Sequence, residues 1–310
     1  MVPNPAHATR QVPRKESARQ AANLWAYKGK ESTPLRMTNS ALMTKRQIAD
    51  LYNRVATDYG QIGPRLFEHF GQRLVQFTGV TADAHVLDIG SGRGASLMPA
   101  AEVTQSNGIV IGTDIAFQMA RETWNECQRR NLANVCLLQV DGDYLAFRSS
   151  SFNFVLCGFA IFLFPDPAHT LREWYRILRP GGKVGICVAS RGDDRWQWYE
   201  QLLLQYQQRH QFPLSPGGSD LRGPGAIKEL MEVTGLRKVE CIEESYEFTY
   251  VDAEEWWQAK WTHGARFPLE QMSKEVLARF RTEVFDRLLH AKAENSINER
   301  WQLAYMIGEK

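Results

Sequence analysis

The sequence predicts a doubly wound α/β fold, in which a mostly parallel sheet of seven strands carries helices on both faces. Short apolar runs alternate with helix-like segments from about residue 85 to residue 190, the pattern of parallel strands joined by crossover helices. The first run ends in a turn with glycines at alternate positions, Gly90, Gly92 and Gly94. Two further strand-like runs near the C-terminus flank a long helical segment, which predicts a helical cap inserted between the last two strands.

The glycine-rich turn separates an apolar strand, residues 86–89, from a helix that can start at Ala95. Glycine adopts positive φ angles and lets a ligand approach the backbone without a Cβ in the way. A helix that starts behind such a turn presents free N–H groups and the positive end of its dipole to a polar ligand. The segment therefore predicts a nucleotide-binding loop. The alternative interpretation is an ordinary tight turn after a strand, with no role in ligand binding.

Asp88, two residues before the first glycine, bears on which nucleotide this loop binds. Gly90-x-Gly92-x-x-Ala95 satisfies the permissive dinucleotide fingerprint, which is weak evidence by itself. Asp-x-Gly-x-Gly-x-Gly, beginning at Asp88, resembles the first motif of class I S-adenosylmethionine (SAM) methyltransferases. A carboxylate here would repel a pyrophosphate, but it suits the sulfonium and amino groups of SAM, directly or through water. Asp88 favours SAM, although this one residue leaves a dinucleotide oxidoreductase open.

A second strand, residues 108–114, ends in Asp114, 24 positions after Gly90. A carboxylate at that distance can accept hydrogen bonds from both ribose hydroxyls. A dinucleotide enzyme would place an acid similarly, so Asp114 indicates a ribose without naming the cofactor. Its neighbour Ile115 belongs to the predicted cofactor site. Met119, on the following helix, is either an adenine contact or ordinary core packing.

A third strand, residues 135–140, leads into a segment with two acids, Asp141-Gly142-Asp143-Tyr144-Leu145-Ala146-Phe147. It resembles the Asp-Ala-x-x-Leu-Pro-Phe segment of the same methyltransferases, in which an acid meets the adenine amino group. Asp141 is the matching position and is preferred over Asp143, while Gly142 and Ala146 depart mildly from the pattern. Gly142, and Cys157 in the fourth strand, complete the predicted cofactor site.

The segments after the third strand decide between the two cofactors. Ser151-Phe152-Asn153-Phe154-Val155 matches the family's Ser-Phe-Asp-x-Val strand, with Asn153 in place of Asp. The run Arg176-Ile177-Leu178-Arg179-Pro180-Gly181-Gly182 is typical of this group and absent from dinucleotide dehydrogenases. With the entry segment Tyr52-Asn53-x-x-Ala56-x-x-Tyr59, the resemblance covers roughly residues 52–189. The chain resembles bacterial type 11 methyltransferases, including enzymes of ubiquinone, menaquinone and natural-product pathways, and the resemblance implies SAM as cofactor.

The chain divides into four predicted parts. Residues 1–40 hold seven basic and two acidic residues and four prolines, which predicts a flexible tail, with a transit peptide as the alternative. Residues 41–80 predict helices that cover the SAM site, and residues 81–190 the SAM-binding core. Residues 191–310 predict the final strands with a helical substrate cap over about 252–294. On the entry helix, Tyr52 and Tyr59 are candidate substrate-lining residues, with simple core packing as the alternative.

The cap contains an unusual aromatic motif, Trp256-Trp257-x-x-x-Trp261-x-His263-Gly264-x-Arg266. Aromatic side chains at this spacing predict a wall for a flat apolar substrate or, equally, packing of the cap against the core. Trp257, Trp261 and Arg266 are therefore candidate substrate-lining residues, as is Phe159 after the fourth strand. His263, before a helix-breaking glycine, is a candidate catalytic base. A structural cap or core residue is the alternative.

The resemblance also predicts how the site closes. In that family the entry helices and the additions after the fifth strand meet above the carboxyl ends of the strands. We therefore predict that the SAM methyl group points into a chamber roofed by both, with Phe159 and Trp257 as apolar walls. Neutral His263 would accept a proton from the acceptor atom, so that its loss would lower turnover by about 10²–10⁴-fold.

The composition of the chain indicates which classes of partner and which cellular compartment to expect. The formal net charge of +2, from 37 basic and 35 acidic residues, argues against binding nucleic acid by phosphate neutralisation. No apolar run approaches the length that spans a bilayer. Five scattered cysteines without Cys-x-x-Cys spacing favour free thiols in a reducing compartment over disulfides or a metal site. We therefore expect a cytoplasmic protein without stable membrane insertion.

The expected reaction is transfer of a methyl group from SAM to O, N or C of a small, largely apolar or aromatic metabolite, of natural-product or quinone type. An RNA methyltransferase shares the predicted core. A catalytically inactive SAM-binding partner subunit also stays open, because methyl transfer depends largely on positioning and requires no particular side chain. The sequence leaves the substrate, the acceptor atom and the oligomeric state, monomer or homodimer, undecided.

Overall fold

A computed structural model describes residues 39–215, 219, 221, 223–290 and 297–310 of the chain. The predicted tail and its transit-peptide alternative lie outside the described residues, except that Asn39 and Ser40 already belong to the first described helix. Residues 216–218, 220, 222 and 291–296 lie outside them as well.

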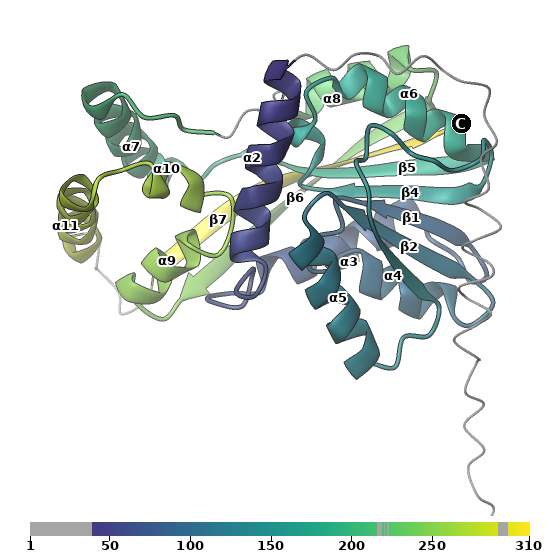
Figure 1. Cartoon of the computed structure of the whole chain (residues 1–310), viewed down its shortest axis with the longest axis horizontal. Helices are drawn as coiled ribbons and strands as arrows, with labels where there is room; N and C mark the ends of the chain where they lie inside the picture. The colour runs from purple at the N-terminus through teal and green to yellow at the C-terminus, as the bar shows by residue number, and fades with distance from the viewer. Residues whose placement is uncertain (1–38, 216–218, 220, 222, 291–296) are drawn as a thin grey trace, which may run out of the picture.

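Seven strands form one sheet: β1 (His85–Ile89), β2 (Ile109–Asp114), β3 (Val135–Gln139), β4 (Phe152–Gly158), β5 (Leu178–Arg191), β6 (Arg237–Tyr250) and β7 (Ile297–Glu309). Their spatial order is β3-β2-β1-β4-β5-β7-β6. The first five strands are parallel, whereas β7 pairs antiparallel with both β5 and β6. The strand order reverses between β1 and β4, which confirms the predicted doubly wound fold (Figure 1). Such a reversal opens a ligand-binding crevice at the carboxyl ends of the strands.

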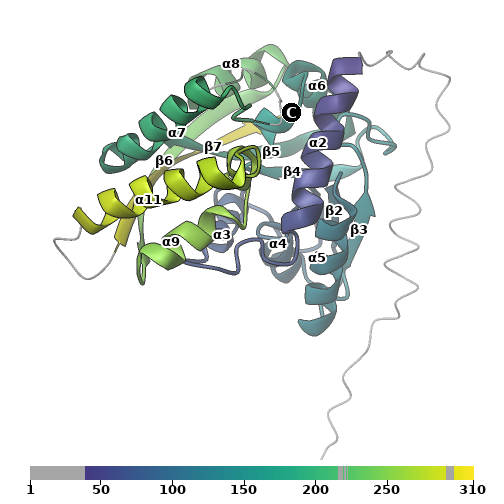
Figure 2. The same ribbon diagram turned by 60° about the vertical axis from the view of Figure 1, so that its left-hand side comes forward.

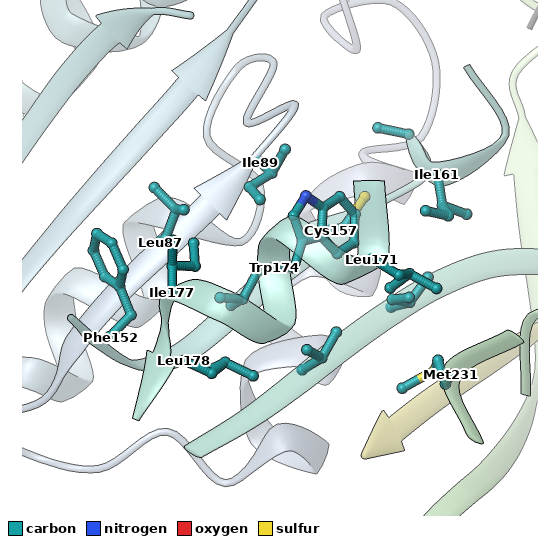
Figure 3. Packing of buried hydrophobic residues seen from close by; sticks show 14 of the residues in the cluster. Leu87, Ile89, Phe152, Cys157, Ile161, Leu171, Trp174, Ile177, Leu178 and Met231 are labelled. Carbon is teal, nitrogen blue, oxygen red and sulfur yellow. The ribbon is translucent and has the colours of Figure 1, made fainter. Parts of the chain in front are cut away.

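Helices cover both faces of this sheet. α6 (Pro167–Ile177) and α8 (Gly223–Val233) pack on one face, and α3 (Leu66–Thr78), α4 (Leu97–Thr104) and α5 (Phe117–Arg129) on the other. Val86 and Leu87 belong to opposite cores, because successive side chains of a strand point to opposite faces. Figure 3 shows Trp174 of α6 packed among strand residues, including Leu87 and Cys157.

The cap lies at one end of the sheet, where the long β6 and β7 extend beyond the parallel strands (Figure 1). It consists of α7 (Gln197–His210), α9 (Ala253–Lys260), α10 (Arg266–Glu270) and α11 (Lys274–His290). The last three lie between β6 and β7 in the chain, which confirms the predicted insertion. The cap has its own apolar core, in which Trp256, Trp257 and Phe280 are buried.

The entry helix α2 (Asn39–Val55) lies between the sheet and the cap, as both views show (Figures 1 and 2). The side-chain oxygen of Asn53 accepts a hydrogen bond from the backbone N–H of Gln118, at the start of α5, over 2.9 Å. The Arg54 guanidinium pairs with Glu270 of α10 over 2.7 Å. The helix is therefore attached on one side to the sheet's helices and on the other to the cap.

A buried carboxylate, Glu299 of β7, joins the cap to the sheet. It accepts hydrogen bonds from the indole N–H groups of Trp256 (3.2 Å) and Trp301 (3.0 Å) and from the Lys260 ammonium (3.2 Å). Burial alone would raise the pKa of Glu299, but the Lys260 charge and these donors lower it below its ordinary value. The group is therefore a buried carboxylate paired with a buried cation.

The cysteines are free thiols. Cys127, Cys157 and Cys187 are buried, Cys136 is half-buried and Cys241 is exposed. Burial raises the pKa of each of these thiols, which disfavours the reactive thiolate. Among the described helices, none combines the length and the apolar character needed to cross a bilayer.

Candidate active site

The glycine loop lies at the carboxyl end of β1, where the strand order reverses. Gly90, Gly92 and Gly94 have φ angles of 65°, 50° and 81°, a region that glycine adopts without steric cost. A Cβ at Gly90 would lie 2.7 Å from the Cβ of Ala160, whereas a Cβ at Gly92 would meet only the Gly90 carbonyl, at 4.0 Å. The loop thus needs glycine for its conformation and leaves open space beside Gly92.

Asp114, the last residue of β2, supports this loop from the side. Its carboxylate accepts hydrogen bonds from the backbone N–H groups of Gly92 (2.9 Å) and Ala116 (2.8 Å). Burial raises the pKa of Asp114 to about 6, and the two amide donors oppose that rise. Each carboxylate oxygen has further lone pairs, so the position suits the predicted contact with ribose hydroxyls.

A pocket opens between the loop and α2, with a total open space of about 700 Å³ that includes its solvent-filled mouth. Three of the predicted substrate-lining residues border it, namely Tyr52, Tyr59 and Phe159. Seven of the ten predicted cofactor residues border it too: Gly90, Gly92, Asp114, Ile115, Met119, Asp141 and Gly142. Residues from five separate parts of the chain therefore meet at one site. Met119 is also part of a small core cluster, so both of its predicted roles are compatible with its position.

The two acids after β3 take different positions. Asp141 borders the pocket and accepts hydrogen bonds from the Asp143 backbone N–H (3.1 Å) and the Lys45 ammonium (2.6 Å). Asp143 is buried, and its carboxylate accepts from the Thr170 hydroxyl and pairs with Lys45 at 2.5 Å. This arrangement favours Asp141 as the acid available to an adenine amino group.

Asp88 differs from its predicted position in the pocket. Its side chain is fully buried below the loop, and it accepts hydrogen bonds from the Ser96 hydroxyl (3.0 Å) and the Leu97 backbone N–H. Burial raises the pKa of Asp88 to about 7, although the Ser96 hydrogen bond opposes the rise. Since Ser96 and Leu97 begin α4, Asp88 holds the start of that helix and does not border either pocket at the loop.

Cys157 also lies away from the pocket. It is fully buried in the core on the α6 face, as Figure 3 shows. Its position in the middle of the sheet explains this burial, because the side chain packs in one cluster with Trp174 and Ile161. Cys187 of the neighbouring β5 instead borders a second pocket, together with Gly94.

This second pocket adjoins the first and shares Tyr59, Gly90 and Phe159 with it. Phe67 and Phe70 of α3 form its aromatic wall, while charged residues gather along the rest of its border: Arg65, Glu68, Arg93, Glu102, Glu126, Arg129 and Arg130. The two pockets together can hold two molecules that meet near Phe159.

The first pocket fits SAM on three observations. Open space beside Gly92 admits a ligand against the backbone. Asp114 and Asp141 provide carboxylate acceptors for hydroxyl and amino groups. Leu163 and Phe164 supply apolar lining for a flat purine.

Comparison with known proteins identifies the reaction class. Residues 87–186 match a family model described as a methyltransferase domain. The chain is 27% identical over 272 residues to the nocamycin O-methyltransferase of Saccharothrix syringae, covering 83% of this chain and 96% of that enzyme. The chain is a SAM-dependent methyltransferase.

Further relatives support the same class. The methyltransferase is 35% identical over 142 residues to the aklanonic acid methyltransferase of a Streptomyces species, 46% of this chain and 64% of that enzyme. It is 27% identical over 163 residues to the demethylmenaquinone methyltransferase of Lactiplantibacillus plantarum, 49% of this chain and 68% of that enzyme. The YcgJ protein of Bacillus subtilis shares the fold, with a TM-score of 0.54 at 18% identity over 78% of this chain and 98% of that one.

Phe159 of this methyltransferase has an unusual backbone. Its φ angle is 56°, a conformation that costs a non-glycine residue of order 1–3 kcal/mol and tends to occur at functional sites. The backbone N–H of Phe159 donates to the Cys187 carbonyl over 2.8 Å, which holds the strained residue in place. Its ring centroid lies 5.7 Å from that of Phe67, 5.4 Å from that of Phe70 and 6.2 Å from that of Trp301.

His263 lies close to this aromatic group without bordering either pocket at the loop. Its ring is half-buried and lies 6.2 Å from that of Phe67. Burial, reinforced by the Lys260 charge, lowers the pKa of His263 to about 4, so the imidazole is neutral at neutral pH. Its Nδ1 accepts a hydrogen bond from the Ala265 backbone N–H over 3.3 Å, which places the proton on Nε2. A ring that donates through Nε2 is poorly suited to the predicted role of base.

The entry helix and the cap turn do meet in this methyltransferase, as predicted. A Cβ at Gly264 would lie 3.4 Å from the Tyr52 hydroxyl, and Glu270 accepts from both Arg54 of α2 and Arg266 of the cap. Burial raises the pKa of Tyr52 to about 12, so its hydroxyl stays neutral beside the pocket.

Trp257, Trp261 and Arg266 lie elsewhere than predicted. Both tryptophans border a separate groove, whose other wall is α11 with Leu277 and Phe285. Arg266 donates to Glu270 over 2.6 Å, and its guanidinium lies 5.8 Å from the Trp261 ring centre. Trp257 is buried in the apolar core of the cap and Trp261 packs partly buried against it, so these side chains contribute to the packing of the cap.

Sequence reasoning missed several residues at the site. Phe67 and Phe70 were recognisable as the apolar face of a helix, but nothing in their spacing indicates that the helix borders a pocket. Trp301 lies in a run of alternating apolar residues near the C-terminus, which indicates a strand but no pocket. Lys45 had no signal, because one lysine on an amphipathic helix is an ordinary surface residue. Its importance depends on contacts with residues 96 positions away.

Proposed function

We propose that this methyltransferase acts on a small, largely apolar or aromatic metabolite that lies against Phe159. The observation that carries the proposal is the strained Phe159 backbone with Phe67, Phe70 and Trp301 around its ring. Aromatic walls bind flat apolar molecules through offset or edge contacts. The names of the relatives described above refer to nocamycin, aklanonic acid and demethylmenaquinone. These names support a natural-product or quinone-type acceptor.

In this proposal SAM lies in the first pocket. Asp114 accepts from the ribose hydroxyls, Asp141 accepts from the adenine amino group, and the loop at Gly90 and Gly92 holds the methionine part. The support is that these groups border one pocket whose size and acceptors suit a nucleoside. Phe159 borders both pockets, so the methyl group and the acceptor would meet beside it.

SAM, when bound, supplies a methyl group activated by its sulfonium charge. The acceptor's lone pair forms the new bond as the carbon–sulfur bond breaks, leaving S-adenosylhomocysteine (SAH), and a proton leaves the acceptor to solvent. The protein's own part is to orient the acceptor and to exclude water. Positioning of this kind contributes a large share of the rate enhancement in such displacements. The half-buried Tyr52 and Tyr59 line the pocket on the side of the entry segment, and no base is required from His263.

The acceptor in this proposal is not a nucleic acid. The net charge of +2 and the pairing of Arg129 and Arg130 with Glu126 leave little free positive charge at the pocket border. The free thiols are compatible with a reducing compartment, and we propose the cytoplasm as the site of action.

Methyl transfer from labelled SAM tests the acceptor class. The purified enzyme is incubated with planar phenols and hydroquinones, with a small-molecule extract and with total RNA. We expect label in small apolar molecules. Salt-sensitive labelling of RNA would contradict the proposal, and complete absence of transfer despite SAM binding would favour the inactive partner subunit.

Asp114→Ala tests the cofactor site. Losing hydrogen bonds to a charged acceptor costs about 1.5–3 kcal/mol, so we expect SAM and SAH to bind roughly 10–150-fold more weakly by calorimetry. Asp50→Ala, on the exposed side of α2, is the control and should bind normally. An unchanged Kd for Asp114→Ala would mean that the ribose lies elsewhere, and tight NAD binding without SAM binding would contradict the cofactor.

A further inference from the structure

Lys45 is a buried cation in the wall of the cofactor pocket. It lies on α2, and only 9% of its side chain is exposed. Of the described residues that border this pocket, it is the single lysine or arginine, opposite two acids, Asp114 and Asp141. Its ammonium group also lies 5.1 Å from the centre of the Tyr144 ring.

The ammonium group joins two carboxylates of the turn after β3. Its Nζ lies 2.6 Å from Asp141 and 2.5 Å from Asp143. Burial by itself would lower the pKa of Lys45, but the two acids raise it above its ordinary value, so the group is charged. Without this cation the two neighbouring carboxylates would repel each other, and Asp143 is too buried for water to screen it.

The helix that carries Lys45 is one wall of the pocket. Lys45, Ile48 and Tyr52 all border it, and residues at spacings of three and four share a face of a helix. The C-terminal end of α2 is attached through Asn53 and Arg54. The N-terminal half of α2 is attached through Lys45, which pairs with the two acids of the turn after β3.

We propose that Lys45 is a positioning residue that fastens α2 over bound SAM and thereby limits the rate at which SAM and its product SAH leave. The inference rests on the proposed placement of SAM in this pocket. Lys45 acts through both carboxylates: the pair with Asp141 orients the acceptor of the adenine amino group, and the pair with Asp143 anchors the helix. Asp143 does not border the pocket. A change at Asp143 therefore tests the attachment of α2 without removing a direct contact with the ligand.

The test measures SAH dissociation from the full-length protein by surface plasmon resonance. Lys45→Met should raise the dissociation rate about tenfold or more, because lid opening controls ligand exit. Lys45→Arg should restore most of the slow exit. Asp143→Asn should also raise the rate, although it changes no residue of the pocket wall. Arg46→Met, an exposed neighbour on the same helix, is the matched control and should leave the rate unchanged.

The outcomes separate this inference from the cofactor assignment. Hydrogen exchange of α2 in the SAH complex should be faster in Lys45→Met than in the wild type, with unfolding temperatures checked for each variant. If Asp114→Ala weakens SAH binding but Lys45→Met and Asp143→Asn leave the dissociation rate unchanged, the proposed role of Lys45 is wrong and the cofactor site stands. If wild-type protein binds no SAH, or Asp114→Ala has no effect, the placement of SAM fails and the inference fails with it.

Discussion

Replacing Glu299 with Gln is expected to lower the free energy of unfolding by about 3–5 kcal/mol. The carboxylate is buried at the junction of β7 and α9, and it pairs with Lys260, whose side chain is 9% exposed. Removing the negative charge leaves the Lys260 cation buried without a counter-ion. It also weakens the hydrogen bonds from the two tryptophan N–H groups. Urea unfolding monitored by circular dichroism measures the loss.

Two further variants show whether the buried pair is the cause. Glu299→Gln combined with Lys260→Met removes both charges and should recover a large part of the loss, since an uncharged replacement of a buried pair is often tolerated. Glu254→Gln breaks a cap ion pair with Arg281 in which both side chains are 47% exposed; its cost should stay within about 1 kcal/mol. Equal losses in the buried and exposed variants would contradict this account.

The stability of the protein should fall between pH 7 and pH 5 because of His263. The folded pKa is about 4 against an ordinary value of about 6.5. Between these values the unfolded chain binds a proton that the folded protein excludes, so stability is lost as pH falls from about 6.5 towards 4. From pH 7 to pH 5 this one group contributes a loss of about 2 kcal/mol.

A comparison with His263→Gln isolates this contribution from all other titrating groups. Urea unfolding of both proteins at pH 7 and pH 5 gives the difference in free energy at each pH. Gln does not titrate, so the wild type should lose about 2 kcal/mol more than the variant on acidification. The charged groups that face the ring are Lys260 and Glu299. Equal pH dependence in the two proteins would show that the ring is hydrated or already protonated.

The sequence by itself determined the order of strands and helices and the position of the cofactor loop. These features are local: Gly90, Gly92 and Gly94 permit the turn whatever surrounds it, and Asp114 follows its strand at the usual spacing. Parallel strands bring their carboxyl ends to one edge of the sheet. For this reason Asp114 and Asp141 could be placed together although they come from different strands.

Only the tertiary structure decided what the side chains of these elements face. Asp88 and Cys157 lie on predicted strands, but the start of α4 covers the first and the core beside α6 encloses the second. Trp257 and Trp261 are in the predicted cap, and they face α11 across a groove that lies apart from the cofactor pocket. Periodicity identifies the apolar face of an element, but the neighbour that covers it comes from a distant part of the chain. Lys45 and Asp141, 96 positions apart, meet only because the entry helix packs across the sheet's edge.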